Sequence, residues 1–280
     1  MSNTAFARLA LFLAFFVAAA AGRGAPADAA ELASDWVKGF NNEARLIAGV
    51  ADAGSGSALF AGVEIAMPPG WKTYWRTPGE AGGVPPEFDW SASENLASAK
   101  VLYPAPSRLT DKSGVVVGYH DRVLFPLEIA PADRVKPILL RVKAAYGVCK
   151  ELCIPAEAEF TLEIPPGAAP SDAIARAIAL TPRYVARAGV DPVLKSWTFE
   201  KPRLTLEVAD PAGADFGDAF VEAPDSLYVP LPKLIERKGG VSLYEVDLSD
   251  GADIAALSGK ALTVTLIGAK GQSETTITLQ

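Results

Sequence analysis

Residues 139–164 read LLRVKAAYGVCKELCIPAEAEFTLEI, and this stretch decides the expected fold. Apolar and polar residues alternate before Cys149 and again after Pro155, as they do along strands with one buried face. Residues four apart in one continuous strand would lie about 13 Å apart, whereas a disulfide requires Cα atoms within about 7 Å of each other. If Cys149 and Cys153 are bonded, the chain therefore reverses between them, with residues 150–152 as the loop of a hairpin.

The role of such a disulfide has two interpretations. Closing a loop of about five residues stabilises a protein by only about 2 kcal/mol, so the hairpin does not need the bond. Lys150 favours a thiolate at Cys149, whereas Glu151 opposes it. The residues alone leave a redox-active pair and an inert structural clip equally open, and the spacing does not indicate a thioredoxin-like site.

Other parts of the chain also predict strands. Alternating runs cover residues 58–67 and 123–129, and clusters of Pro and Gly at residues 68–70, 82–86 and 104–106 separate such runs. Many short strands with turn residues between them are typical of an antiparallel sandwich or barrel. An all-β fold is therefore expected.

The pattern changes after residue 165 and then resumes. Ser171 is expected to cap a short helix over residues 172–180, and strands follow at residues 197–208, 219–221 and 227–231. Two hairpins are expected next, over residues 233–248 and 261–279. We therefore predict a β-sandwich domain at residues 31–165, a short helical linker at residues 166–190, and a second, smaller β-sandwich at residues 191–280.

The first 30 residues are expected to comprise a signal peptide and an N-terminal tail. Arg8 precedes the apolar run LALFLAFFVAAAA at residues 9–21, which is shorter than the about 20 residues of a membrane span and typical of a secretory signal. We expect an exported protein without stable membrane insertion. The net charge of −7 and the lack of a basic run argue against nucleic acid as a partner.

A metal site is a weaker hypothesis. His120 is the only histidine, and we interpret it as a polar strand or loop residue rather than a ligand. A copper site formed by the two cysteines and Met67 is chemically reasonable because soft sulfur ligands select Cu(I). Met67 is more readily explained as a core residue, so no metal and no bound cofactor are expected.

Three motifs resemble the periplasmic N-terminal domain of DsbD-type thiol:disulfide interchange proteins, especially the ScsB-like branch. They are PGWKTYWRTPG at residues 69–79, VGYHDRVLFPLE at residues 117–128 and YGVCKELCIPAE at residues 146–157. The resemblance implies an immunoglobulin-like sandwich with a reversible Cys149–Cys153 disulfide, followed by a second sandwich. It also implies that Cys153 forms mixed disulfides and that Cys149 resolves them.

The resemblance further suggests which residues surround the cysteines. Residues 107–119 match the position of a cap loop in the family, but the acidic and aromatic cap motif of DsbD is not reproduced there. The residues expected to support the site are Tyr74, Trp71, Tyr119, Tyr146, Lys150 and Pro155.

The function implied by this resemblance is thiol–disulfide interchange in the periplasm. Expected partners are periplasmic thioredoxin-like proteins or disulfide isomerases. Because DsbD and ScsB continue into membrane and thioredoxin-like domains and this sequence ends at Gln280, a separate membrane-embedded reductase is the expected electron donor. The alternatives are a non-enzymatic β-sandwich adapter with a structural disulfide or, less favoured, a copper-binding protein.

Overall fold

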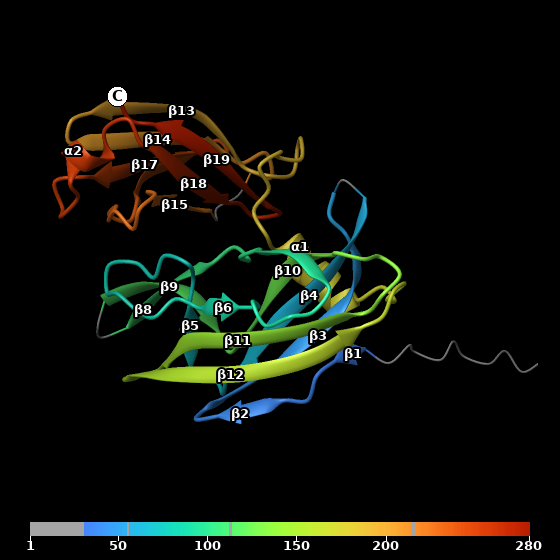
Figure 1. Ribbon diagram of the computed structural model, residues 1–280. Coiled ribbons are helices and arrows are strands. Elements are labelled where there is room, and N and C mark those ends of the chain that lie inside the picture. Colours follow the sequence, from blue (N-terminus) through green and yellow to red (C-terminus); the bar gives the residue numbers. More distant parts are fainter. Residues whose placement is uncertain (1–30, 55, 112–113, 214–216) are drawn as a thin grey trace, which may run out of the picture. The chain divides into compact units, whose positions relative to one another are not determined.

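Antiparallel strands form nearly all of the regular structure in the computed structural model, which describes residues 31–54, 56–111, 114–213 and 217–280. Residues 31–280 form one compact unit. The predicted signal peptide and tail at residues 1–30 lie outside the described residues. The strands belong to four sheets, which confirms the predicted all-β, sandwich-type fold (Figure 1).

Two six-stranded sheets form what we call the N-terminal sheet pair. The first has the order β1-β3-β4-β10-β7, with β2 paired to β3, and the second has the order β12-β11-β5-β9-β8, with β6 paired to β11. Their bounds are β1 (Leu32–Ala33), β2 (Val37–Gly39), β3 (Asn42–Asp52), β4 (Ser57–Ala66), β5 (Lys72–Tyr74), β6 (Glu87–Asp89), β7 (Leu96–Val101), β8 (Ser107–Asp111), β9 (Gly114–His120), β10 (Arg122–Pro131), β11 (Ile138–Cys149) and β12 (Cys153–Ile164).

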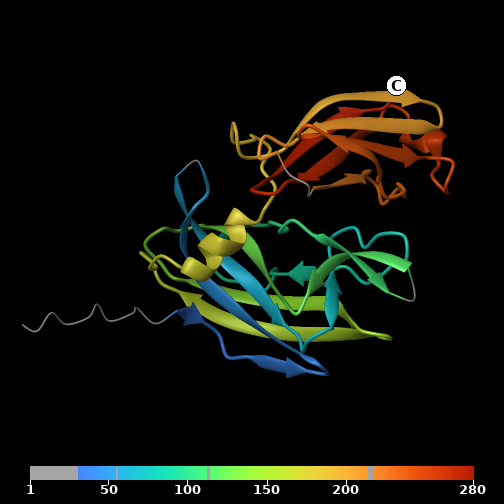
Figure 2. The same ribbon diagram turned by 180° about the vertical axis from the view of Figure 1, so that it is seen from behind.

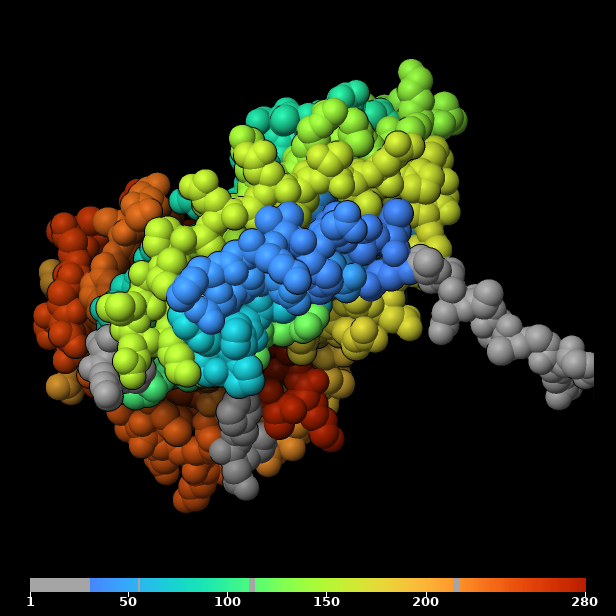
Figure 3. All heavy atoms as spheres, turned by 90° about the horizontal axis from the view of Figure 1, so that it is seen from below, coloured from blue at the N-terminus to red at the C-terminus, as the bar shows by residue number. Residues whose placement is uncertain are grey.

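The core of this pair lies between the two sheets. In β12, Ala158, Phe160, Leu162 and Ile164 are buried while the residues between them are exposed, because alternate residues of a strand face opposite sides. Figure 3 shows the residues of β1 and β2 in blue on one face of the molecule, next to the yellow-green residues of β12. β12 is an edge strand, since its only hydrogen-bonded neighbour in the sheet is β11.

Helix α1 (Asp172–Ala179) covers the outer face of the first sheet (Figure 2). The predicted cap is confirmed, since the Ser171 side chain accepts a hydrogen bond from the Ile174 amide. Ile174 and Ile178 are buried and pack with Ile47 and Phe60. The helix thus contributes its own small apolar cluster against the sheet.

Two smaller sheets form the C-terminal sheet pair, with the orders β13-β14-β17-β16 and β15-β18-β19. Fifteen buried apolar residues, contributed by both sheets and their loops, form a second core. The bounds are β13 (Val193–Glu200), β14 (Arg203–Ala209), β15 (Asp218–Glu222), β16 (Lys233–Lys238), β17 (Val241–Asp247), β18 (Ala261–Ile267) and β19 (Gln272–Thr278), with helix α2 (Ile254–Leu257) between β17 and β18.

Two details of this region differ from expectation. Residues 197–208 are not one strand, because the chain turns at Lys201 and Pro202 between β13 and β14. Residues 227–231 are not a strand, although Val229 and Leu231 are buried.

The domain boundaries given above remain a prediction. In the described part of the chain, neither helix is long and apolar enough to span a membrane.

Candidate functional site

The two cysteines close the tip of a long hairpin. β11 and β12 pair in unbroken register from Ile138↔Ile164 to Cys149↔Cys153. The cysteines are bonded, with their Cα atoms 4.2 Å apart. Residues 150–152 form the loop, so the hairpin predicted from the spacing is confirmed.

The two sulfur-bearing residues have different environments. Cys149 is 1 % exposed and lies on an interior strand, paired with Cys153 on one side and with Lys72 of β5 on the other. Cys153 is exposed and lies at the end of the edge strand β12. A partner protein can therefore reach Cys153 more easily than Cys149.

Tyr74 links both cysteines to β5. Its hydroxyl oxygen lies 2.9 Å from Cys149 Sγ and 2.7 Å from Cys153 Sγ. The hydroxyl is the donor in the oxidised protein, because a disulfide carries no proton. Tyr74 is 2 % exposed and forms a small buried cluster with Leu109, Val116 and Cys149. The site thus combines a sulfur pair, a tyrosine hydroxyl in contact with both sulfurs, and an apolar cluster beside them.

Two glycines, which the sequence analysis did not single out, make room for the Tyr74 ring. A Cβ atom at Gly83 would lie 2.3 Å from the ring, and one at Gly147 would lie 3.0 Å from it. The Gly147 carbonyl also accepts a hydrogen bond from the Thr73 hydroxyl at 2.8 Å. The only signal in the sequence was the turn cluster at residues 82–86, which identifies a turn but not the ring that it covers.

Three other predicted site residues lie around the hairpin tip. Trp71 precedes β5 and contacts the exposed ring of Phe40 edge to face, with 6.2 Å between ring centroids. Lys150 is exposed, and its side chain passes close to Gly70. Pro155 is exposed and pairs with Gly147 across the hairpin.

The remaining two predicted residues lie in the core. The Tyr119 hydroxyl donates to the Pro104 carbonyl at 2.8 Å, and the Tyr146 hydroxyl donates to Asn42 Oδ1 at 2.7 Å. Burial raises the pKa of Tyr119 above its ordinary value and that of Tyr146 to about 12. Both groups stay protonated at neutral pH, and their hydroxyls bond to groups other than the sulfurs.

The segment at the position of the family's cap loop is part of a sheet. β8 and β9 pair from Ser107↔Gly118 to Asp111↔Gly114, and residues 112–113 lie outside the described residues. Leu109 and Val116 of this hairpin belong to the buried cluster with Tyr74 and Cys149. The segment therefore supplies one apolar wall of the site.

The residues considered for metal binding do not come together. Met67 is buried in the core of the N-terminal sheet pair, whereas His120 is exposed with its Nδ1 3.4 Å from the Trp71 carbonyl oxygen. Among the described residues, no group of three or more His, Cys, Asp or Glu side chains is placed to hold a metal ion.

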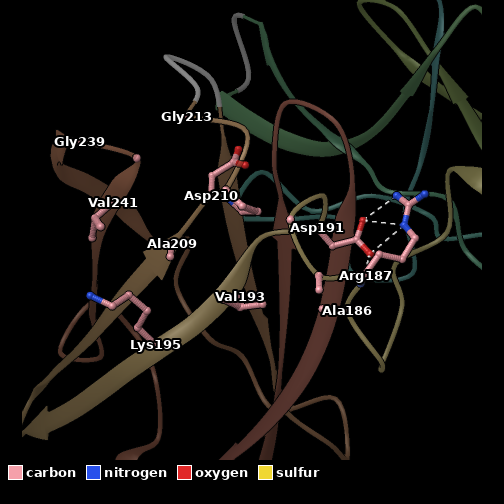
Figure 4. A pocket seen from close by; sticks show the side chains of 14 residues that line it. Ala186, Arg187, Asp191, Val193, Lys195, Ala209, Asp210, Gly213, Gly239 and Val241 are labelled. Carbon is pink, nitrogen blue, oxygen red and sulfur yellow. Dashed lines mark hydrogen bonds and ion pairs between the residues drawn. The ribbon is translucent and has the colours of Figure 1, made fainter.

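A large hollow of about 780 Å³ lies elsewhere, at one end of the C-terminal sheet pair (Figure 4). Its lining includes Lys195, Asp210 and the glycines at positions 239 and 240. The charges of Arg187 and Asp191 at its rim are paired with each other, with 2.6 Å between Arg187 Nη2 and Asp191 Oδ1. The hollow is open and contains no sulfur.

The comparisons with known proteins agree with this geometry. Residues 45–165 match the family model described as the N-terminal domain of the thiol:disulfide interchange protein DsbD. The fold is similar to the crystal structure of the N-terminal periplasmic domain of ScsB from Proteus mirabilis, with a TM-score of 0.68 and 22% sequence identity over 89% of this chain and 98% of that one. No curated protein sequence matches the chain. Residues 45–165, which carry the Cys149–Cys153 disulfide, are thus similar to the N-terminal domain of DsbD, and this match supports a thiol–disulfide interchange module.

Proposed function

We propose that this protein passes reducing equivalents between protein partners in the periplasm through a reversible Cys149–Cys153 disulfide. The observation that carries the proposal is the unequal exposure of the two cysteine residues, whose sulfurs both contact Tyr74. An exposed Cys153 beside a buried Cys149 suits exchange, in which one sulfur meets the partner and the other is released and protected.

The reaction has two steps. A thiolate of the donor attacks Cys153 Sγ, the Cys149–Cys153 bond breaks, and Cys149 leaves as a thiolate. The second thiol of the donor, once deprotonated, attacks the donor sulfur in the mixed disulfide and releases Cys153 as a thiolate. The donor is oxidised to a disulfide, and this protein takes up two electrons and two protons as two thiols.

The reverse sequence reduces an acceptor. The Cys153 thiolate attacks an acceptor disulfide, and Cys149 resolves the mixed disulfide. We propose a membrane-embedded reductase as the donor and thioredoxin-like proteins or disulfide isomerases as acceptors. These are the partner classes implied by the DsbD N-terminal family match.

Tyr74 is proposed as the group that favours the reduced state. Its hydroxyl is within hydrogen-bond distance of both sulfurs, and a thiolate accepts a hydrogen bond more strongly than a disulfide sulfur does. The donor is already in place when the bond breaks, so the leaving Cys149 thiolate is stabilised without rearrangement.

A purely structural role for the disulfide has less support. The hairpin is held by twelve register pairs over residues 138–149 and 153–164, and a small loop gains only about 2 kcal/mol from closure. The bond therefore adds little to an element that forms without it.

The test is the redox equilibrium of the purified protein with glutathione, read by trapping free thiols. A redox pair is expected to have a potential between about −270 and −120 mV, the range of thioredoxin-like exchange proteins. A potential below about −300 mV, typical of structural disulfides, combined with a large loss of stability on reduction, would instead support the adapter function.

A further inference from the structure

One strand of the C-terminal sheet pair has side chains in both cores. Ala219 and Val221 of β15 belong to the core of the C-terminal sheet pair, whereas Phe220 belongs to the core of the N-terminal sheet pair. Asp218 and Glu222 share the face of Phe220, since alternate residues of a strand point the same way. The three residues of this face all contact the N-terminal sheet pair.

At one end of β15, Glu222 binds Arg76. Arg76 Nη2 lies 2.6 Å from Glu222 Oε2 and 2.5 Å from Glu274 Oε2 of β19, and Arg76 Nε donates to Glu222 Oε1 at 3.0 Å. Burial by itself lowers the pKa of Arg76. The hydrogen bonds and charges of Glu222 and Glu274 outweigh this effect, so the pKa is raised above its ordinary value. This two-pronged geometry holds a guanidinium in one orientation.

At the other end of β15, Asp218 binds a second arginine, Arg108. In the middle of the strand, Phe220 contacts Trp75. Arg108 Nε donates to Asp218 Oδ2 at 2.8 Å, and Arg108 Nη2 donates to the Pro232 carbonyl at 2.7 Å. The Phe220 ring contacts both Trp75 and Arg108, with its centroid 5.5 Å from the Trp75 ring centroid and 5.3 Å from Arg108 Cζ.

The residues that β15 contacts are close in sequence to residues that line the disulfide. Trp75 and Arg76 directly follow Tyr74, and Arg108 directly precedes Leu109, which is in the buried cluster with Tyr74 and Cys149. β5 is only three residues long, and each of its residues pairs with β9. One end pairs with Cys149 through Lys72, and the other continues into the residues held by β15.

We propose that β15 positions the redox site: by binding Arg76 and Arg108 it fixes the segment that carries Tyr74, and so sets the redox equilibrium of Cys149 and Cys153. This inference rests on the proposed function. Glu222 and Asp218 are positioning residues, because they act on the sulfurs only through Tyr74 and its neighbours. The C-terminal sheet pair would thus tune the chemistry of a site to which it contributes no sulfur.

The test is a double-mutant cycle with Glu222→Gln and Tyr74→Phe in the complete protein. Glu222→Gln keeps the shape of the side chain but removes one of the two carboxylate charges that hold Arg76, leaving that of Glu274. We expect it to shift the redox equilibrium at least threefold toward the disulfide, because a less fixed Tyr74 stabilises the thiolate less. In the Tyr74→Phe background the same substitution should have no further effect, since coupling of two residues appears as non-additivity.

Asp191→Asn is the matched control. It removes a buried charge that pairs with Arg187. Among the described residues, Asp191 has no hydrogen bond or ion pair with residues 74–77, so the substitution destabilises the protein without loosening Tyr74. Its redox equilibrium should equal that of the unmodified protein. If Glu222→Gln prevents folding, Asp218→Asn tests the same strand through Arg108.

Two results would overturn the inference: an unchanged equilibrium in Glu222→Gln, or a shift of the same size with and without the Tyr74 hydroxyl. The equilibrium is measured against both glutathione and dithiothreitol, so that a disulfide with a very negative reduction potential also yields a value. Failure of the proposed function would appear in the unmodified protein, whereas failure of this inference would appear only in the differences between variants.

Discussion

The tip of the β11–β12 hairpin and the hollow beside the β16–β17 hairpin make an instructive comparison. The first has a disulfide, an exposed Cys153 and a buried tyrosine whose hydroxyl contacts both sulfurs. The second is lined by the Gly239–Gly240 turn and a self-paired Arg187–Asp191 couple. The hollow thus has no sulfur among its described lining residues, whereas the hairpin tip carries the disulfide.

A protein partner, as proposed above, would account for this difference. A pocket is needed when a small molecule must be surrounded, whereas disulfide exchange between proteins requires only that one sulfur be reachable and the other be protected. The search for function in this fold should therefore begin at exposed hairpin ends. Four predictions test this comparison, given in order of decreasing effect on the sulfur chemistry.

The largest effect is expected from the cysteines. Cys149→Ser should leave Cys153 free to form a mixed disulfide that cannot be resolved, so a thioredoxin-like partner should be trapped covalently. Cys153→Ser should leave only the buried Cys149 and trap little. Non-reducing electrophoresis with mass spectrometry measures both, and equal trapping by the two variants would contradict the assigned roles.

Tyr74→Phe should shift the redox equilibrium about tenfold toward the disulfide, because a hydrogen bond to a charged group contributes about 1.5–3 kcal/mol and about 1.4 kcal/mol is a tenfold change. Thiol trapping in glutathione buffers measures the shift. Tyr119→Phe is the control, since it removes a hydroxyl bonded to Pro104 and should leave the equilibrium unchanged. Similar shifts in both variants would show that Tyr74 has no special role.

Gly83→Ala should shift the equilibrium severalfold in the same direction by displacing the Tyr74 ring, which lies 2.3 Å from the added Cβ position. Overpacking of this kind destabilises a protein by about 1–3 kcal/mol, measurable by denaturant unfolding. At Gly82, with a φ of +71°, an added Cβ meets no atom within 4 Å, so Gly82→Ala should affect stability alone. A redox shift at Gly82 but not at Gly83 would contradict the proposed contact.

Asp191→Asn, beside the hollow, should leave the redox equilibrium unchanged and lower the free energy of unfolding by about 1–3 kcal/mol, the cost of weakening a buried polar contact. Burial favours a higher pKa for Asp191, but hydrogen bonds from Arg187 outweigh it and hold the pKa below 3.8. The pair therefore stabilises the protein above about pH 3.8, and this contribution is lost as the pH falls through the lower folded-state pKa. Urea unfolding at several pH values should show a weaker dependence in Asp191→Asn than in the unmodified protein, because Asp247 and Glu274 also have lowered pKa values and remain in both. Any effect on exchange would assign chemistry to the hollow.

The sequence predicts those features that depend on local geometry. The hairpin between Cys149 and Cys153 follows from strand spacing, and the helix cap at Ser171 follows from side-chain chemistry. The break at Pro202 was missed even though proline disfavours the interior of a sheet. The position of Tyr74 came from family resemblance, because no local pattern in residues 72–74 indicates a contact with residue 149.

Contacts between distant segments were the least predictable. The steric need for Gly83 depends on a ring nine residues away in the sequence. Likewise, the alternating residues of β15 look like any half-buried strand, and nothing in them indicates that Phe220 joins the core of the N-terminal sheet pair. Such features arise from packing of complete sheets rather than from the pattern within any one strand.

The edge position of β12 has a mechanical consequence. When the bond between the sulfurs is open, Cys149 is still clamped between two neighbouring strands, whereas Cys153 is tied to only one. The two halves of the site therefore differ in compliance, since the Cys153 backbone is displaced more easily than the Cys149 backbone. In the proposed exchange, a partner would therefore displace the Cys153 backbone to align three sulfurs, while the two neighbouring strands keep Cys149 Sγ in place.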